Sequence, residues 1–100
     1  PVSSAYVIFE PGARSFWYTH PIGQVLIIVE GEGRSGVYGK PVSVLKKGDV
    51  VVCPKGIKHF HGAAPDKRMV QMTVTGYDPQ GKNVTWMEPV TDQQYKNSEK

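Results

Sequence analysis

The three histidines of this 100-residue chain fall in two short windows of the sequence. His20 stands two residues after Tyr18, and His61 stands two residues after His59. Because residues i and i+2 of a β-strand point to the same face of a sheet, each pair would present two rings to one side. Imidazole is the commonest metal ligand and titrates near neutral pH, so two inward-facing pairs predict a metal or proton-transfer site.

Gln24 shares the strand parity of Tyr18 and His20, although Pro21 and Gly23 interrupt the run. Two or three imidazoles together with an amide oxygen suit Mn, Fe, Ni, Cu or Zn. A single histidine in a strand is more often packed or solvated than functional. The interpretation therefore depends on the spacing of these residues and not on their number.

The elements that must position these side chains are short β-rich runs separated by Gly, Pro and Asp. This punctuation is typical of an antiparallel barrel or sandwich and not of alternating strands and helices. We expect strands at residues 5–9, 16–20, 25–29, 33–38, 42–45, 50–53, 69–75 and 84–87. The run 25–29 is wholly aliphatic, which predicts a central strand buried on both faces.

Glycine marks the expected turns at residues 30–33 and 47–49, because glycine adopts positive φ at little cost. Thr91 is followed three residues later by Gln94, the spacing of a capping box, which predicts one short helix near the C-terminus. The length fits a single domain at residues 1–96, followed by a polar tail at residues 97–100. Pro1 leads almost directly into a strand-like stretch, which leaves open whether further residues precede it.

Composition sets limits on partners and location. The formal net charge is +3, but the basic residues are scattered, so we expect no nucleic-acid partner. No apolar run approaches the ~18 residues of a membrane span, so we expect no membrane partner and a cytoplasmic location. Cys53 is the only cysteine, which excludes an intrachain disulfide, and we interpret it as a small buried hydrophobic residue.

Two spacings in the chain resemble the conserved motifs of the cupin superfamily. The first motif, G-x5-H-x-H-x3-E-x6-G, is matched by Gly12, Tyr18, His20, Gln24 and Gly31. The second motif, G-x5-P-x-G-x2-H, is matched by Gly48, Pro54, Gly56 and His59. The likeness extends over most of the chain and is greatest to the cupin-type hydroxynitrile lyases and their uncharacterised relatives.

This resemblance implies an all-β fold, the antiparallel jelly-roll barrel of the cupins, in a chain that forms homodimers. It also implies a divalent transition metal inside the barrel, which would be Mn, Fe, Ni or Zn. The positions that match its ligands are Tyr18, His20, Gln24 and His59. The hydroxynitrile-lyase-like cupins share this glutamine. Neutral histidine and glutamine ligands would leave the full charge of the cation facing a small anionic or carbonyl-derived substrate.

Tyr18 departs from the motif, because a phenol stands where the first histidine ligand is expected. A phenol with a pKa near ~10 must lose its proton to bind a metal as an anion, which costs roughly 4 kcal/mol at pH 7. Tyr18 is therefore either a ligand or a cavity-wall aromatic whose hydroxyl bonds a water or a ligand. The second alternative leaves open a degenerate site that holds no metal.

Proton transfer in the lyases that this chain resembles is assigned to a hydroxyl residue and a later histidine, which correspond here to Ser15 and Gln71. Serine keeps the hydrogen-bonding role, whereas glutamine cannot act as a general base near neutral pH. His61 is the expected substitute acid or base. We expect a small-molecule-binding cupin that acts as a metal-dependent lyase, isomerase or oxygenase, and the alternative is a non-catalytic ligand-binding or sensing cupin.

Overall fold

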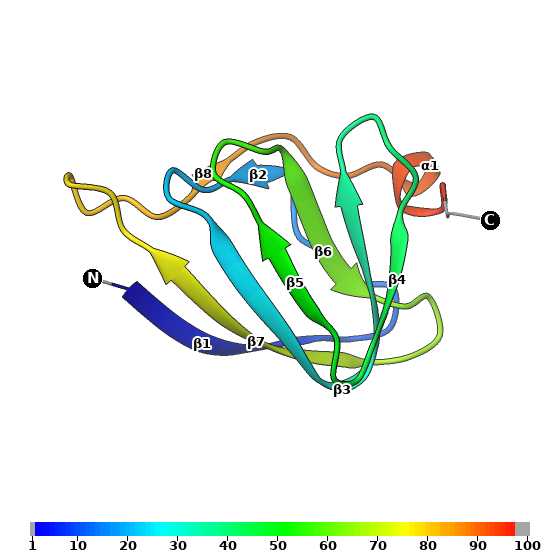
Figure 1. Ribbon diagram of the computed structural model, residues 1–100. Coiled ribbons are helices and arrows are strands. Elements are labelled where there is room, and N and C mark those ends of the chain that lie inside the picture. Colours follow the sequence, from blue (N-terminus) through cyan, green and yellow to red (C-terminus); the bar gives the residue numbers. More distant parts are fainter. Residues whose placement is uncertain (1, 98–100) are drawn as a thin grey trace.

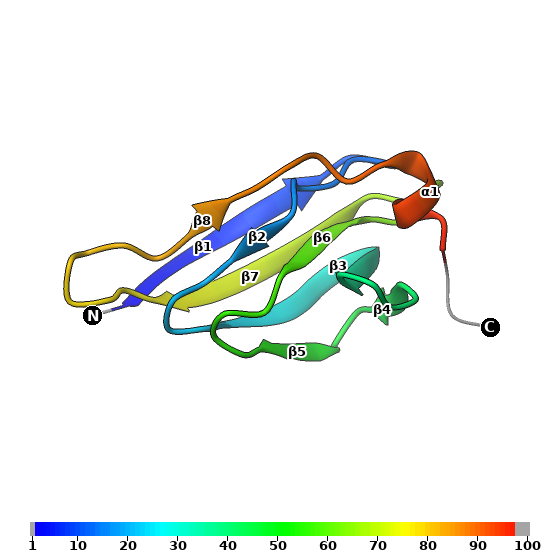
Figure 2. The same ribbon diagram turned by 90° about the horizontal axis from the view of Figure 1, so that it is seen from above.

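The computed structural model describes residues 2–97, and these residues form an almost wholly β structure (Figure 1). The described elements are β1 (Val2–Phe9), β2 (Tyr18–Thr19), β3 (Gln24–Val37), β4 (Ser43–Lys46), β5 (Val50–Cys53), β6 (His59–Ala63), β7 (Met69–Gly76), β8 (Thr85–Trp86) and α1 (Asp92–Tyr95). Helix α1 and the N-terminal end of β1 lie at opposite ends of the molecule (Figure 2). No helix within residues 2–97 is long and apolar enough to cross a membrane.

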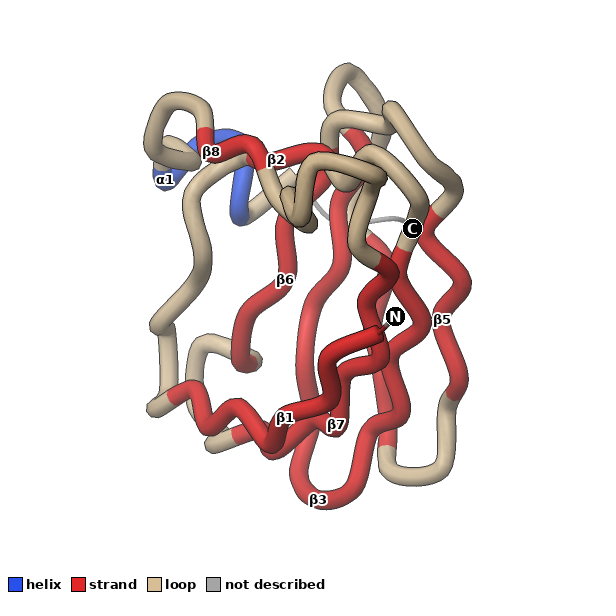
Figure 3. The backbone as a smooth tube through the Cα atoms, turned by 90° about the vertical axis from the view of Figure 1, so that its left-hand side faces the viewer, coloured by secondary structure: helices blue, strands red, loops and turns tan. Residues whose placement is uncertain are grey.

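The long strand β3 joins two sheets, because its two halves have different partners. Its first half, residues 24–31, lies between β5 and β7, and β1 continues that sheet beyond β7. Its second half, residues 32–37, lies between β4 and β6, and β2 and β8 continue that sheet. All these pairings are antiparallel, and the strands curl around a shared interior (Figure 3). The predicted all-β jelly-roll class with a short C-terminal helix is confirmed.

The hairpin turn predicted at residues 30–33 is wrong, because β3 passes through this stretch as one strand. The pairing of β3 with β7 shifts register between Ile28 and Glu30, which marks a β-bulge. Gly31 follows this bulge with a φ of +79°, and a Cβ built there would lie 1.8 Å from the carbonyl oxygen of Arg68. The glycine thus permits a bulge and a close backbone approach, which the sequence pattern does not distinguish from a turn.

Strand β6 is missing from the expected strands, although the spacing of His59 and His61 implies extended backbone there. All five residues of β6 are buried. The strand is short and lacks a run of β-branched or aliphatic residues, and its polar histidines are as buried as Phe60, so an apolar pattern does not mark it. The structure shows that β6 contributes side chains both to the interior and to the packing against α1.

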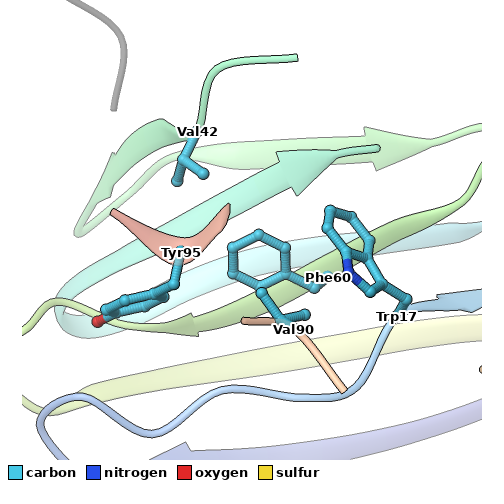
Figure 4. Packing of buried hydrophobic residues seen from close by; sticks show 5 residues of the cluster. All are labelled: Trp17, Val42, Phe60, Val90 and Tyr95. Carbon is cyan, nitrogen blue, oxygen red and sulfur yellow. The ribbon is translucent and has the colours of Figure 1, made fainter. Parts of the chain in front are cut away.

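The outer side of β6 packs against the C-terminal segment (Figure 4). The buried cluster there consists of Trp17, Val42, Phe60, Val90 and Tyr95. The rings of Trp17 and Phe60 meet edge to face, with centroids 5.1 Å apart. Because neighbouring residues of an extended chain point to opposite sides, this cluster turns Tyr18, His59 and His61 toward the interior.

The short helix α1 begins with the predicted capping box, in which Thr91 and Gln94 bond each other's backbone amides. The hydroxyl of Tyr95 donates a hydrogen bond to the backbone carbonyl of Ala63, at the end of β6. The carbonyl of Asn97 accepts a 2.7 Å hydrogen bond from the Val42 amide, whereas residues 98–100 of the predicted tail lie outside the described residues. These contacts hold the helix against β6.

Candidate functional site

Four rings converge between the two sheets. The ring centroid of Tyr18 lies 4.9 Å from that of His20, 4.4 Å from that of His59 and 5.9 Å from that of His61. The His59 centroid lies 5.5 Å from His20 and 5.2 Å from His61. Tyr18 pairs with His59 across β2 and β6, and all four residues are buried. The spacing that places Tyr18 with His20, and His59 with His61, thus corresponds to one interior cluster.

Gln24, the first residue of β3, is tied to this cluster through Tyr18. The Tyr18 hydroxyl donates a 3.1 Å hydrogen bond to Oε1 of Gln24. The Gln24 amide nitrogen in turn donates a 3.0 Å hydrogen bond to the hydroxyl of Thr75 on β7. The amide is therefore fixed in orientation by two strands, with its oxygen turned toward the phenol.

Two of the histidines are held in the way that metal-binding histidines usually are. Nδ1 of His20 donates to the backbone carbonyl of Asn83, and Nδ1 of His59 donates to the carbonyl of Ile57 over 2.6 Å. A carbonyl only accepts hydrogen bonds, so each Nδ1 carries a proton, and in the neutral ring Nε2 keeps a lone pair. Both Nε2 atoms are buried without a partner, and such outer contacts orient ligating imidazoles in metal sites.

His61 and Cys53 form a second contact next to His59. Nε2 of His61 lies 3.4 Å from Sγ of Cys53, which ends β5, and Nδ1 of His61 is buried without a partner. Among the His, Cys, Asp and Glu side chains of residues 2–97, those of Cys53, His59 and His61 are the only three whose ligating atoms all lie within 4.8 Å of one another. The predicted burial of Cys53 is confirmed, but its contact with His61 was not predicted. Strand β5 is apolar throughout, which hides the alternation that turns Val51 and Cys53 inward.

Burial favours the neutral forms of Tyr18, Cys53, His59 and His61. Burial raises the pKa of the Tyr18 phenol well above its usual value and raises the pKa of the Cys53 thiol to about 11. Burial also lowers the pKa of His59, and burial with the neighbouring His59 and His20 lowers the pKa of His61 well below its usual value. The buried polar residues are the three histidines, Gln71, Thr73 and Thr75, so no carboxylate offsets an incoming cation within the described core.

Ser15 and Gln71, the residues expected to assist proton transfer, have different surroundings. The Ser15 hydroxyl accepts a 3.2 Å hydrogen bond from the backbone amide of His61 and donates to the carbonyl of Phe16. Ser15 thus contacts the backbone and not the ring of His61. Gln71 lies on the buried face of β7, and its Oε1 atom has no partner.

A hollow of about 320 Å³ lies at the end of the sheet where the first residues of β3 meet the end of β5. Residues that line it include Gln24, Cys53, Val25 and Val52, whereas the rings of the interior cluster are not among them.

Residues 5–75 match the family described as the cupin domain, and this match covers most of the chain. The chain belongs to the cupin family. It is 47% identical over 95 residues to an (R)-mandelonitrile lyase of Granulicella tundricola, a match that covers 95% of this chain and 72% of that protein. Both spacings that resemble the cupin motifs, at residues 12–31 and 48–59, lie within the matched residues.

Solved structures show the same fold. A cupin-like protein from Thermotoga maritima superimposes with a TM-score of 0.89 and 41% identity, covering 98% of this cupin and 74% of the other chain. The DMSP lyase DddQ from Ruegeria pomeroyi superimposes with a TM-score of 0.70 over 91% of this cupin and 45% of its own chain. Its identity of 21% supports a shared fold and nothing more specific.

The residues at the cupin ligand positions provide some of the ligands that a metal needs, but not all of them. The two imidazoles of His20 and His59 offer free, pre-oriented Nε2 atoms. Tyr18, at the first ligand position of the motif, offers instead a protonated phenol that is already bonded to Gln24. A metal in this interior would thus depend on imidazole nitrogens, and the protonated Tyr18 would supply no anionic ligand.

Proposed function

We propose that this cupin binds a small organic molecule in its interior, beside a divalent transition metal, and that it carries out lyase-type chemistry. One observation carries the proposal. Four buried side-chain atoms within the described residues have no hydrogen-bond partner, and they are Nε2 of His20, Nε2 of His59, Nδ1 of His61 and Oε1 of Gln71. An unsatisfied buried polar group costs about 1–3 kcal/mol, so four of them in one small interior favour a bound polar ligand.

His59 is the metal ligand that we assign first, because it belongs to both sets of donors in this interior. The set predicted from the motif adds His20, Gln24 and Tyr18, and the neighbouring set adds Cys53 and His61. A bound divalent cation would stabilise negative charge on a carbonyl or cyanohydrin oxygen. The identity with a mandelonitrile lyase supports this class of chemistry over an isomerase or an oxygenase.

The remaining side chains suit the binding of a small anion or carbonyl compound. The Tyr18 phenol stays protonated because burial raises its pKa, so it donates hydrogen bonds rather than binding metal as an anion. Burial lowers the pKa of His61 and so favours its neutral ring, whose unpartnered Nδ1 atom can exchange a hydrogen bond with a substrate hydroxyl. Gln71 can donate or accept a hydrogen bond but takes no proton. Ser15 positions His61 through its backbone.

A second candidate function is a ligand-binding cupin that contains no metal and performs no reaction. One observation favours it, namely that Tyr18 and Gln24 satisfy each other through the hydrogen bond between them. In that case the four unpartnered atoms would bind a polar ligand directly.

Titration of mandelonitrile into the metal-loaded protein tests the proposal, with binding followed by amide NMR and cleavage by benzaldehyde absorbance. We expect shifts in β2, β6 and the buried face of β7, together with cleavage that is lost in His59→Ala. Shifts without cleavage, both in the wild type and in a Tyr18→His/Gln71→His variant, would favour the second candidate. A wild type that shows no interior shifts would contradict both functions for this class of ligand.

We further propose that two copies of this cupin associate through the outer face of the sheet β1-β7-β3-β5. One row of paired residues across this face consists of Tyr6, Met72, Ile27 and Val50, and all four are apolar. The most exposed apolar side chains of the face, each 59–69% exposed, are Val2, Tyr6, Ile8, Val50 and Val52.

The size of this face supports a second copy as its partner. The exposed apolar side chains present on the order of 500 Å², at the upper end of the patches found on monomers. The half-buried Ile27, Met72 and Val74 lie between them and extend the apolar face, and a stable interface buries roughly 800 Å² per partner. A twofold axis through the face would pair the same residues of each copy, as in most homodimers.

A further inference from the structure

We propose that Cys53, His59 and His61 form a thiolate–imidazole site for a divalent cation such as Zn²⁺ or Co²⁺, with a fourth position open to substrate or water. This inference rests on the proposed function, because it names the ligands of the metal proposed there. His59 is the only residue that this site shares with the motif-based ligand set. The site also makes the single cysteine of the chain a metal ligand.

The distance between Cys53 and His61 fits a tetrahedral centre. In such a centre the metal–sulfur bond is about 2.3 Å and the metal–nitrogen bond about 2.0–2.1 Å, which places sulfur and nitrogen roughly 3.5 Å apart. The observed distance from Sγ of Cys53 to Nε2 of His61 is 3.4 Å. All three ligating atoms lie within 4.8 Å of one another, so a cation can be bound with only small side-chain adjustments.

The three residues are held in place by different parts of the two sheets. His59 and His61 lie on the inner side of β6, and Cys53 ends β5, where it pairs with Gln24. Their exposed fractions are 6% for Cys53, 2% for His59 and 0% for His61. The Ile57 carbonyl fixes Nδ1 of His59, which leaves its Nε2 atom available. The site is thus buried, and its three ligands are held by the two strands β5 and β6.

The motif-based alternative contains two histidines, His20 and His59, together with a phenol and an amide. Tyr18 takes the first ligand position, and its hydroxyl is bonded to Gln24. His20 is not among the side chains whose ligating atoms gather within 4.8 Å of one another. His20 Nε2 is instead buried without a partner, and the His20 ring centroid lies 4.9 Å from that of Tyr18.

A thiolate ligand selects among metals. Sulfur and imidazole ligands suit Zn²⁺ and Co²⁺, whereas Mn²⁺ and Mg²⁺ favour oxygen ligands. On binding, the Sγ–H bond of Cys53 breaks, the sulfur pair forms the bond to the metal, and the proton passes to solvent. The thiolate supplies the one negative charge that the buried core otherwise lacks.

Titration of Co²⁺ into the reduced, chelator-treated full chain tests this site, because Co²⁺ reports its ligands by absorbance. We expect about one Co²⁺ per chain, with the near-ultraviolet thiolate-to-cobalt band and the intense visible bands of a tetrahedral centre. Cys53 is the only cysteine, so a thiolate band in the monomeric complex can arise from no other residue. We expect Cys53→Ala and His61→Ala to lose the thiolate band and to bind Co²⁺ at least ~10-fold more weakly.

The His20→Ala variant separates this site from the motif-based one, and it should keep the thiolate band. Circular dichroism and thermal melting of each variant show whether a lost signal reflects unfolding, and Cys53→Ser provides a variant of nearly native size. If Co²⁺ binds without a thiolate band and is lost in His20→Ala, this inference is overturned, while a metal-dependent function stands. If the folded wild type binds no Co²⁺, both this inference and the metal of the proposed function are wrong.

Discussion

The hydroxyl of Tyr18 donates a 3.1 Å hydrogen bond to Oε1 of Gln24, so the phenol and the amide at two cupin ligand positions satisfy each other. Burial raises the pKa of Tyr18 well above its usual value, which keeps the phenol protonated. The neighbouring His20 and His59 meanwhile keep unpartnered Nε2 atoms. Tyr18 thus separates this cupin from a standard three-histidine centre.

Replacing Tyr18 with histidine is expected to restore that centre. The Tyr18→His variant adds an imidazole beside His20 and frees Oε1 of Gln24, so we expect it to bind Ni²⁺ at least ~10-fold more tightly than the wild type. Calorimetric titration of chelator-treated protein measures this change. Tyr18→Phe is the matched control, because it frees Gln24 without adding a ligand. An equal gain in Tyr18→Phe would show that the added imidazole is not responsible.

Acid is expected to destabilise the metal-free protein through His59 and His61. Burial lowers the pKa of both rings in the folded state, below the ~6.5 of an unfolded histidine. Unfolded chains therefore bind more protons, and the stability present above pH ~6.5 is lost as the pH falls through the folded-state values. Urea unfolding at pH 7.5 and 5.5, with a chelator present, should give a lower free energy of unfolding at pH 5.5.

The His59→Gln and His61→Gln variants provide the comparison for this pH effect. Each removes one titrating ring and keeps a polar side chain, so the difference between the two pH values should shrink in each variant. A difference that is unchanged in both variants would assign the acid sensitivity to other groups.

The apolar face of the sheet β1-β7-β3-β5 predicts a dimer that charge can separate. Tyr6 and Val52 are 69% and 68% exposed, so Tyr6→Lys/Val52→Lys should leave the fold intact and place like charges across the interface. Light scattering after gel filtration should give a dimer for the wild type and a monomer for the variant. Val44→Lys, on β4, is a control that should remain dimeric. A monomeric wild type at tens of micromolar would contradict the proposed interface.

Phe60 is expected to be a main anchor of the cluster beneath α1. Its side chain is fully buried and meets Trp17 edge to face, so Phe60→Ala should reduce the free energy of unfolding by about 3–5 kcal/mol. Phe16→Ala is the matched control, because Phe16 is 52% exposed and should change stability by less than about 1 kcal/mol. Similar losses in the two variants would argue against this cluster as the basis of packing at β6.

Sequence reasoning predicted the parts of the fold that have a local cause. The capping box at Thr91 and Gln94 and the antiparallel strand class both follow from short patterns, and the structure confirms them. The turn expected at residues 30–33 failed because the reason for Gly31 is distant in sequence. A Cβ there would meet the Arg68 backbone, which lies on the neighbouring chain segment.

The inward orientation of the site residues could be predicted from the two-residue period of a β-strand. The spacing of Tyr18 with His20, and of His59 with His61, indicates which side chains face inward. The contact between Cys53 and His61 was not predictable in this way, because it depends on how β5 packs against β6 across the interior. The pairing of Tyr18 with Gln24 likewise depends on the path of the chain between β2 and β3.

The metal content of the purified protein is the sharpest test of a metal centre at His59, since His59 belongs to both ligand sets proposed for this interior. Elemental analysis of chains purified without added metal, and again after incubation with Zn²⁺, Ni²⁺, Mn²⁺ and Fe²⁺ followed by desalting, should be compared with the folded His59→Ala variant. We expect about one transition metal per wild-type chain and almost none in His59→Ala. A wild type that retains no stoichiometric metal, or a variant that retains as much as the wild type, would contradict a metal centre at His59.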